Sequence, residues 1–308
     1  MTRRRSLTSL ILASALLLTA CAQHLNLPED RQSSVPRTGF EVTRDLTISP
    51  EDWPQTLYAD LYEPQNSDAH RPAVLMVHGG GWEGRSRGDM NRMSRALARA
   101  GFVVLNVDYR FAPEYPFPHA LHDVQIAMHW LHDQASDLHI DPDRIGSAGF
   151  SSGAHLVSLM AMVAGQDGPL DAPYGGERTR PYALVAGGTP SDLQKFADGR
   201  LVEQFLGGTR AEVPEQYALA SPVEHIHPDA PPVFLFHGTW DQLVPPDHAT
   251  DFLAQLEAQG VQAELFKQRL RGHATSLFLA GDATRAAIRF LSSVSAPGSP
   301  DPDPDRPQ

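Results

Sequence analysis

The chain has 308 residues, of which 41% are hydrophobic and 20% are charged, and these values are ordinary for a globular protein that can bury a sizeable core. Its 25 basic and 37 acidic residues give a formal net charge of −12, which argues against nucleic acid as a partner, because nucleic-acid binding needs a cationic surface. The same charge argues against a binding face for anionic lipid. The single cysteine, Cys21, excludes an internal disulfide, and we expect neither a metal ion nor a cofactor.

The N-terminus has the pattern of a bacterial export signal. Three arginines at 3–5 precede an apolar stretch at 10–20, which is shorter than a typical transmembrane helix. Leu18-Thr-Ala-Cys21 resembles the lipobox of bacterial lipoproteins. The resemblance implies that residues 1–20 are a signal peptide and that Cys21 is lipidated and holds the protein in the cell envelope. The same resemblance, with Ala22 in place of an aspartate, implies sorting to the outer membrane. The alternative is an ordinary signal peptide with an incidental cysteine.

The composition predicts one folded domain between two polar ends. Residues 21–39 are predicted to be a polar tether, and the Pro/Asp-rich segment 295–308 is predicted to be a disordered tail. The domain itself is predicted to occupy residues 40–294. The sequence does not indicate an oligomeric state.

Within the domain, strand and helix patterns alternate. Strands are predicted at 40–48 and 57–62, as an antiparallel edge pair, and then at 73–77, 102–107, 144–148, 182–185, 232–236 and 263–267. Helices are predicted at 90–100, 118–134, 152–163, 248–259 and 274–291, the last with a possible break at Gly281. This alternation predicts a central, mostly parallel, eight-stranded sheet with helices on both faces. The carboxyl ends of the parallel strands then share one rim, where ligands bind, and short helices from 189–231 should lie over it.

The sequence Gly149-Phe-Ser-Ser-Gly153 lies between a predicted strand and a predicted helix. This is the context of a nucleophile elbow, in which a strained turn lifts the serine hydroxyl above the sheet. Side chains at 149 and 153 would collide with the neighbouring strand and helix, so glycine is needed at both positions. Ser151 is therefore the predicted nucleophile.

The sequence His78-Gly-Gly-Gly-Trp82 follows the strand that ends at Val77. Glycines let backbone N–H groups approach a ligand closely, and an oxyanion needs such donors. We expect the N–H groups of Gly80 and Gly81, with that of Ser152, to form an oxyanion hole. A phosphate-binding loop is disfavoured because no Gly-Lys-Ser/Thr sequence ends the motif. His78 itself is predicted to be structural.

The base and its carboxylate partner should follow the serine in the order acid, then histidine. Asp241 comes directly after the strand 232–236, and His273 comes after the last strand and before the last helix. His273 can take the proton of Ser151, and Asp241 can orient the imidazole. The competing acids are Asp192, which follows a different strand, and Asp282, which comes after the histidine.

Other polar and aromatic residues receive structural interpretations. Asp108-Tyr-Arg110 is predicted to be a turn in which Arg110 pairs with a carboxylate. The histidines of the helix 118–134 are predicted to be surface or packing residues. Trp82 and Trp240 flank the predicted site, and either could line a substrate pocket or simply pack.

Five motifs together carry a family resemblance: His78 to Trp82, Asp108 to Glu114, Gly149 to Gly153, His237 to Asp241, and Gly272-His273. As a set they resemble carboxylesterases related to hormone-sensitive lipase. Gly-Phe-Ser-x-Gly-x-His-Leu is more similar to a branch with kynurenine-formamidase-like and bacterial feruloyl- and acetyl-xylan-esterase-like enzymes. The resemblance covers residues 40–293 and implies the α/β-hydrolase fold. No helical cap is expected at the N-terminus, so the site should be open.

The favoured hypothesis is a serine esterase that cleaves short acyl or aryl esters, either small or linked to a polysaccharide, through an acyl-enzyme. One alternative is an amidase of the arylformamidase type, against which the export signal argues. Another is a catalytically silent hydrolase scaffold that binds within the envelope.

Overall fold

The computed structural model describes residues 22–26, 37–65, 70–196 and 199–294. Its centre is a nine-stranded sheet with the order β1-β9-β8-β7-β6-β4-β5-β3-β2. The strands are β1 (Ala22–Leu25), β2 (Phe40–Thr47), β3 (Tyr58–Pro64), β4 (Arg71–Val77), β5 (Val103–Val107), β6 (Ile140–Phe150), β7 (Leu184–Gly187), β8 (Val233–Gly238) and β9 (Ala263–Gln268).

In the middle of the sheet the neighbouring strands β5, β4, β6, β7, β8 and β9 pair in parallel. The pairs toward the two edges are antiparallel, beginning with β3 and β5. β2 and β3 form the predicted antiparallel pair at one edge. β1 pairs with β9 at the other edge. The parallel strands carry their connections on the faces of the sheet, as right-handed crossovers require.

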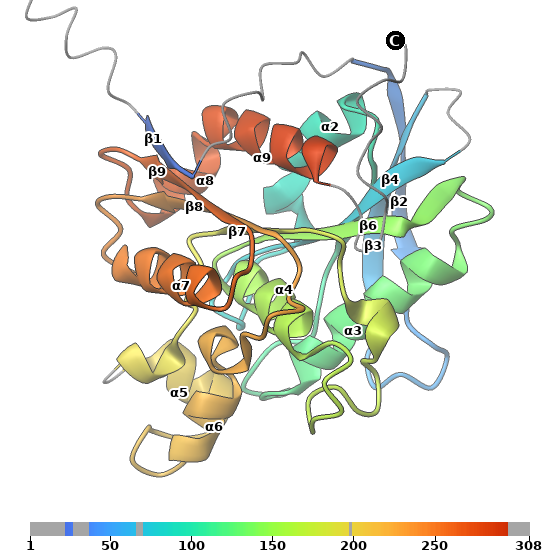
Figure 1. Ribbon diagram of the computed structural model, residues 1–308. Helices are drawn as coiled ribbons and strands as arrows, with labels where there is room; N and C mark the ends of the chain where they lie inside the picture. The colour runs from blue at the N-terminus through green and yellow to red at the C-terminus, as the bar shows by residue number, and fades with distance from the viewer. Residues whose placement is uncertain (1–21, 27–36, 66–69, 197–198, 295–308) are drawn as a thin grey trace, which may run out of the picture.

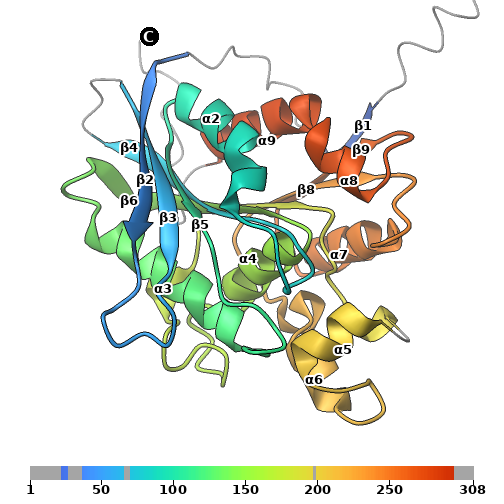
Figure 2. The same ribbon diagram turned by 180° about the vertical axis from the view of Figure 1, so that it is seen from behind.

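Helices cover both faces of the sheet (Figures 1 and 2). α3 (His119–Asp133), α4 (Ser152–Val163) and α7 (Asp247–Ala258) lie on one face, and α2 (Asn91–Arg99) and α9 (Gly281–Ser293) lie on the other. The remaining helical segments are η1 (Arg87–Met90), η2 (Glu177–Thr179), η3 (Leu193–Lys195), α5 (Arg200–Leu206), α6 (Pro214–Leu219), η4 (Pro222–His225) and α8 (His273–Phe278).

The two faces of the sheet bury separate hydrophobic clusters, and β4 shows why. Ala73, Leu75 and Val77 point into the cluster beneath α3, α4 and α7. Val74 and Met76 point into the cluster beneath α2 and α9. Successive side chains of a strand face opposite sides, so a strand buried on both faces is apolar throughout rather than alternating.

The predicted α/β-hydrolase architecture is confirmed, with one correction to the strand count. The sheet has nine strands rather than the eight expected, because Ala22–Leu25 forms β1. These residues lie in the segment predicted to be a polar tether, so for them that prediction is wrong. The last predicted helix is divided, with α8 ending at Phe278 and α9 beginning at Gly281. The predicted signal peptide, Cys21 and the C-terminal tail lie outside the described residues.

The segment 189–231 carries η3, α5, α6 and η4, as the sequence predicted. In Figures 1 and 2, α5 and α6 project from one end of the molecule, below the sheet. Before β2, residues 22–26 and 37–39 contain a strand and no helix. In the part of the chain that the structure describes, no helix is long and apolar enough to cross a bilayer.

Candidate active site

Ser151 occupies a strained turn between β6 and α4. Its backbone has φ +55° and ψ −125°, which is unusual for a residue with a side chain. The turn is held by a 2.8 Å hydrogen bond from Ser151 N to Gly187 O of β7 and a 2.9 Å bond from His155 N to Ser151 O. The strain is therefore offset by hydrogen bonds on both sides, as a nucleophile elbow requires.

The two glycines of the elbow are required by close packing. A Cβ atom at Gly149 would lie 2.6 Å from the carbonyl group of Gly153. A Cβ atom at Gly153 would lie 2.3 Å from the carbonyl oxygens of Val77 and His78. Contacts this short with backbone atoms cannot be relieved by moving a side chain, so the steric argument drawn from the sequence holds at both positions.

The structure brings Ser151, His273 and Asp241 together. His273 Nε2 lies 2.8 Å from Ser151 Oγ, and His273 Nδ1 lies 2.6 Å from Asp241 Oδ2. Each side chain follows the carboxyl end of a parallel strand, namely β6, β8 and β9. The carboxylate of Asp241 accepts from one ring nitrogen, which leaves the other free to accept a proton from the serine hydroxyl.

Asp241 is buried but strongly held in its ionised form. Burial opposes ionisation, yet hydrogen bonds from His237 and His273 outweigh it and hold the pKa of Asp241 well below its usual range. The N–H groups of Leu243 and Val244 donate to Asp241 Oδ1 at 3.0 and 2.9 Å. Asp241 is therefore a fixed anion that can stabilise an imidazolium at residue 273.

His237 is a second histidine in contact with this carboxylate. Its Nε2 lies 2.9 Å from Val244 O and 3.4 Å from Asp241 Oδ2, so Nε2 carries a proton. The sequence placed His237 in a motif but gave it no role. Only the folded loop reveals that its ring lies behind Asp241 and supports the loop from which Asp241 projects.

The glycine loop after β4 passes close to the nucleophile. A Cβ atom at Gly79 would lie 3.0 Å from Ser151 Cβ, and Gly80 and Gly81 have φ values of +135° and +63°. Among the described residues, the N–H groups of Gly80, Gly81 and Ser152 donate no hydrogen bond. Gly81 and Ser152 line the same cavity as Ser151, whereas Gly80 is not among the residues that line it.

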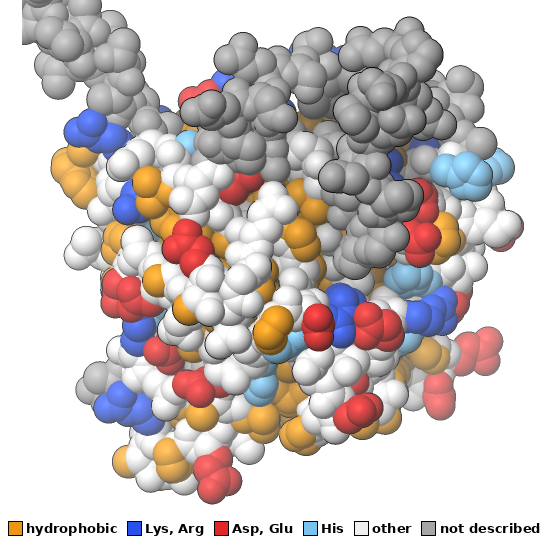
Figure 3. Space-filling model, viewed as in Figure 1, with side chains coloured by type: hydrophobic (Ala, Val, Ile, Leu, Met, Phe, Trp, Pro, Cys, Tyr) orange, Lys and Arg blue, Asp and Glu red, His pale blue; other side chains and the backbone are white. Residues whose placement is uncertain are grey.

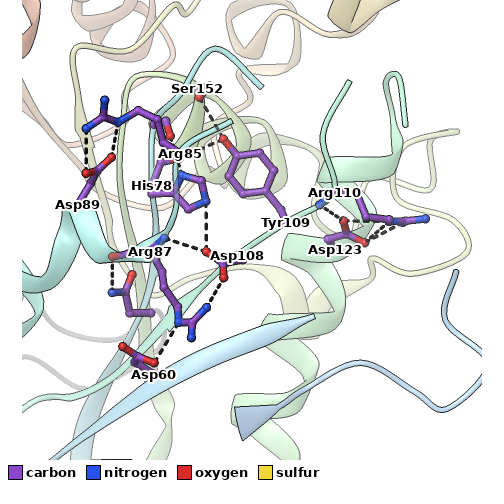
Figure 4. A network of polar contacts seen from close by, with 12 residues as sticks. Asp60, His78, Arg85, Arg87, Asp89, Asp108, Tyr109, Arg110, Asp123 and Ser152 are labelled. Carbon is purple, nitrogen blue, oxygen red and sulfur yellow. Dashed lines mark hydrogen bonds and ion pairs between the residues drawn. The ribbon is translucent and has the colours of Figure 1, made fainter. Parts of the chain in front are cut away.

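A buried stack supports this loop from behind (Figure 4). The rings of His78 and Tyr109 are stacked with centroids 4.6 Å apart. Tyr109 Oη lies 3.2 Å from His78 O, to which it donates, and 3.1 Å from Ser152 Oγ. Tyr109 thus joins the start of the glycine loop to the residue after the nucleophile. Burial raises the pKa of Tyr109 and lowers that of His78, so both side chains are uncharged.

Charged pairs surround the stack (Figure 4). Asp108 accepts a 2.8 Å hydrogen bond from Arg87 N and pairs with the Arg87 side chain, which also bonds Asp60 at 2.9 Å. The predicted partner of Arg110 is Asp123 of α3, at 2.7 Å. These pairs fix the turn after β5, and hence Tyr109, relative to the glycine loop.

A cavity of about 630 Å³ opens beside Ser151. Its walls come from the glycine loop, from α5 and the segment before it, and from the loop after Asp241. Trp82 lines the cavity while its ring stacks on Phe205 at 4.5 Å and donates to His155 Nδ1 at 3.3 Å. Trp240 is 62% exposed and is not among the lining residues, so the structure does not support the predicted pocket contact for it.

The competing acids lie elsewhere. Asp192 caps η3, where its Oδ1 accepts a 3.0 Å hydrogen bond from Gln194 N. Asp282 forms an exposed pair with Arg285 at the start of α9. Neither is paired with His273. In α3, the ring of His129 contacts the carbonyl oxygens of Tyr174 and Gly175, in line with the packing role predicted for the histidines of this helix.

Comparison with known proteins places this geometry in a family. The model of the BD-FAE family matches residues 59–256, which include Ser151, Asp241 and the glycine loop. The chain belongs to the BD-FAE family. The match to the family model ends at residue 256, so it does not include His273.

Relatives of this BD-FAE chain include enzymes named as esterases. It is 29% identical over 270 residues to a probable carboxylic ester hydrolase, LipM, of Mycobacterium tuberculosis, covering 83% of this chain and 62% of that protein. It is 36% identical over 134 residues to an arylesterase of Saccharolobus solfataricus, covering 42% of each chain. The chain thus spans less than two thirds of the length of these relatives.

A solved structure supports the fold. Thermogutta terrifontis esterase 2, phosphorylated by paraoxon, matches with a TM-score of 0.69 and 22% identity, covering 88% of this chain and 98% of that one. Because the sequence identity is low, the match shows only that this BD-FAE chain has the α/β-hydrolase fold.

Proposed function

We propose that this chain is a serine hydrolase that cleaves carboxylic esters through an acyl-enzyme. The observation that carries the proposal is the continuous hydrogen-bonded chain from Asp241 through His273 to Ser151. The names of the relatives favour an ester as the bond that is cleaved. The set of motifs favours, within the family, the feruloyl- and acetyl-xylan-esterase-like branch.

In this mechanism, His273 Nε2 accepts the proton of Ser151 as Oγ attacks the ester carbonyl carbon. The carbonyl π bond opens, and its oxygen becomes an oxyanion that accepts hydrogen bonds from the N–H groups of Gly80, Gly81 and Ser152. The imidazolium is stabilised by Asp241 and then protonates the departing alcohol. Water, activated by the same imidazole, releases the acid and restores Ser151.

The proposed substrates are short acyl or aryl esters. Apolar side chains form much of the wall of the cavity beside Ser151, among them Phe196, Leu201, Val202 and Leu243. A compact acyl or aromatic group would bury its surface there, while the open mouth leaves room for a bulky alcohol portion.

We further propose that Cys21 carries lipid and that the protein is held in the bacterial cell envelope, at the outer membrane. This rests on the arginines at 3–5, the short apolar stretch and the sequence Leu-Thr-Ala-Cys. Incorporation of labelled palmitate into the natural protein, and its loss in Cys21→Ser, tests this part.

Turnover of p-nitrophenyl acetate by the natural protein and by Ser151→Ala tests the ester hydrolysis. The variant should lose at least about a thousandfold in kcat, because the nucleophile is removed, while its circular dichroism spectrum stays unchanged. Equal turnover by a folded Ser151→Ala protein would refute the proposal.

A further inference from the structure

The described chain begins beside the candidate active site. β1 runs antiparallel to β9, and Ala22 pairs with Gln268, the last residue of β9. The carboxyl end of β9 belongs to the rim that carries His273, which follows Gln268 closely in the chain. In Figure 1, β1 lies next to β9 and α8. The N-terminal segment therefore enters the domain at the rim rather than at the opposite end of the sheet.

β1 is held in place by side chains as well as by strand pairing. His24 Nε2 bonds Glu264 Oε2 at 2.9 Å, and the His24 ring packs edge-on against Phe234 and Phe266. Asn26 Nδ2 donates to Ala263 O at 3.2 Å. Cys21 directly precedes β1 in the sequence, so the lipid proposed for it would be attached to the residue before this strand.

Exposed apolar side chains gather at the same rim. We call Trp240, Leu243, Leu270, Phe278 and Leu279 the rim patch. Their exposed fractions are 62%, 55%, 61%, 51% and 50%, and among the described residues the only other exposed large hydrophobic side chain is Tyr58, at 43%. The rim patch brackets Asp241 and His273 in the chain. Clustered exposed apolar residues mark an interaction surface more often than isolated ones do.

The two loops that carry most of the rim patch are bonded to each other. Trp240 N donates to Arg271 O at 2.9 Å, and Leu270 N donates to Thr239 Oγ1 at 3.0 Å. Leu270 is held at φ +59°, where a leucine is unfavourable. Leu270 is thus exposed to solvent although its backbone conformation is unfavourable for leucine.

Basic side chains accompany these apolar ones. Lys267, Arg269 and Arg271 lie within the five residues 267–271, and the structure gives none of them an ion pair among the described residues. Figure 3 shows basic and hydrophobic side chains close together at the upper left, over the end of the molecule where β1 and β9 lie in Figure 1. The net charge of −12 thus conceals a local cluster of cations beside the rim.

We propose that the rim patch and these three cations rest on an anionic lipid bilayer, so that the mouth of the candidate active site faces the membrane. The proposal rests on the lipid proposed for Cys21. Trp and Leu side chains enter the interfacial layer, the cations contact lipid phosphates, and the acidic remainder of the surface is repelled from the leaflet. Lipid and a basic patch together fix both the attachment and the orientation.

This orientation restricts the substrate. An ester carried by a molecule at the membrane surface would reach Ser151 directly, whereas a long polymer in solution would have to enter between the rim and the bilayer. Small soluble esters would still diffuse into the cavity.

Quenching of tryptophan fluorescence by brominated lipid tests the orientation. The full chain is placed in vesicles of phosphatidylcholine and phosphatidylglycerol whose acyl chains carry bromine, and in matched vesicles without bromine. Trp240 is the only tryptophan of the rim patch; Trp53, Trp82 and Trp130 lie elsewhere. Bromine should quench part of the emission, and Trp240→Phe should remove most of the quenched part.

Two further variants separate the apolar contact from the charges. Leu270→Asn suits the left-handed backbone better than leucine, so the fold should be at least as stable, yet quenching should fall several-fold. Arg269→Glu should also lower quenching several-fold. Arg99→Glu is the matched control, since Arg99 is exposed at the C-terminal end of α2 and its guanidinium lies over the ring of Phe40 in β2, at the opposite edge of the sheet, and it should leave quenching unchanged.

Three results would overturn the proposal. One is vesicle-bound protein whose quenching is the same in Trp240→Phe, and another is protein that does not sediment with the vesicles. The third is a dimer in solution that protects Trp240 without bromine quenching, which would assign the rim patch to a second copy. Palmitate incorporation shows separately whether Cys21 carries lipid, and p-nitrophenyl acetate turnover in the same samples reports on the esterase.

Discussion

His273 Nε2 lies 2.8 Å from Ser151 Oγ, although 122 residues separate the two in the chain. The sheet accounts for this proximity, because β6 and β9 are parallel and both end at the same rim. The hydroxyl is placed by the strained turn at φ +55°, and the ring by its 2.6 Å contact with Asp241. The proposed chemistry depends on both restraints.

The identity of the acid can be tested by an isosteric change. Asp241→Asn keeps the volume of the side chain but cannot stabilise an imidazolium, and its amide favours the wrong tautomer of His273. We expect kcat for p-nitrophenyl acetate to fall roughly 10⁴-fold. Asp192→Asn, at the competing acid, should stay within about twofold of the natural protein, since its effect is limited to the cap of η3. The reverse ranking of the two variants would assign the acid to Asp192.

Tyr109 offers a test of how the glycine loop is supported. Tyr109→Phe removes the hydroxyl that bonds both His78 O and Ser152 Oγ but keeps the stacked ring. Without these hydrogen bonds the activation free energy should rise by about 1 kcal/mol, which lowers kcat several-fold with little change in KM. Tyr182→Phe is the control, because it removes another buried hydroxyl, bonded to Leu291 O at 2.8 Å, far from the loop. Similar kinetics for both variants would show that Tyr109 is merely structural.

The Arg110–Asp123 pair should contribute strongly to stability. Both side chains are buried, and Asp123 also accepts 2.8 Å bonds from Arg110 N and from Trp53 Nε1. Arg110→Met leaves a buried carboxylate without its counter-charge, so the free energy of unfolding should fall by about 3–5 kcal/mol. The control is Arg178→Met, which breaks an exposed pair with Asp133 and should cost less than about 1 kcal/mol. Urea titration measures both, and a small loss at Arg110 would contradict the prediction.

His155 predicts a dependence of stability on pH. Burial lowers its pKa from 6.5 to about 4, and its neutral ring donates to Ala220 O and accepts from Trp82. Between these values the unfolded chain binds a proton that the folded chain does not. The contribution of His155 to the free energy of unfolding is therefore complete above pH 6.5. About 3 kcal/mol of it is lost as the pH falls toward 4.

His155→Gln isolates this contribution, because glutamine can donate and accept hydrogen bonds but does not titrate. The free energy of unfolding of the variant should fall less steeply between pH 6.5 and 4 than that of the natural protein. His248, whose pKa is also lowered to about 4 by burial, remains in both proteins and does not affect the difference. Parallel pH profiles for the two proteins would contradict the prediction.

Much of the fold and of the candidate site could be predicted from local patterns. Alternating strand and helix signals indicate the layers, and the positions of Ser151, Asp241 and His273 just after strands place them on one rim. This works because parallel topology converts position along the chain into position in space. The need for glycine at 149 and 153 could also be predicted, because it follows from the local sequence of strand, turn and helix around Ser151.

The features that the sequence did not reveal depend on distant contacts. The four residues of β1 have no strand pattern of their own, and they are ordered by β9, some 240 residues away. The roles of His237 and Tyr109 depend on which carbonyl and hydroxyl groups the folded loops bring near them. Trp240 was judged from its position beside Asp241, but its ring points to solvent rather than into the cavity.

The most direct test of the central proposal is labelling with a fluorophosphonate, followed by identification of the modified peptide by mass spectrometry. The reagent forms a stable phosphonyl ester only with a serine that an adjacent base activates. The natural protein should be modified at Ser151, and His273→Ala should label far more slowly although it retains that serine. A folded protein that is not labelled, or that is labelled at another serine while Ser151 remains free, would contradict the proposed function.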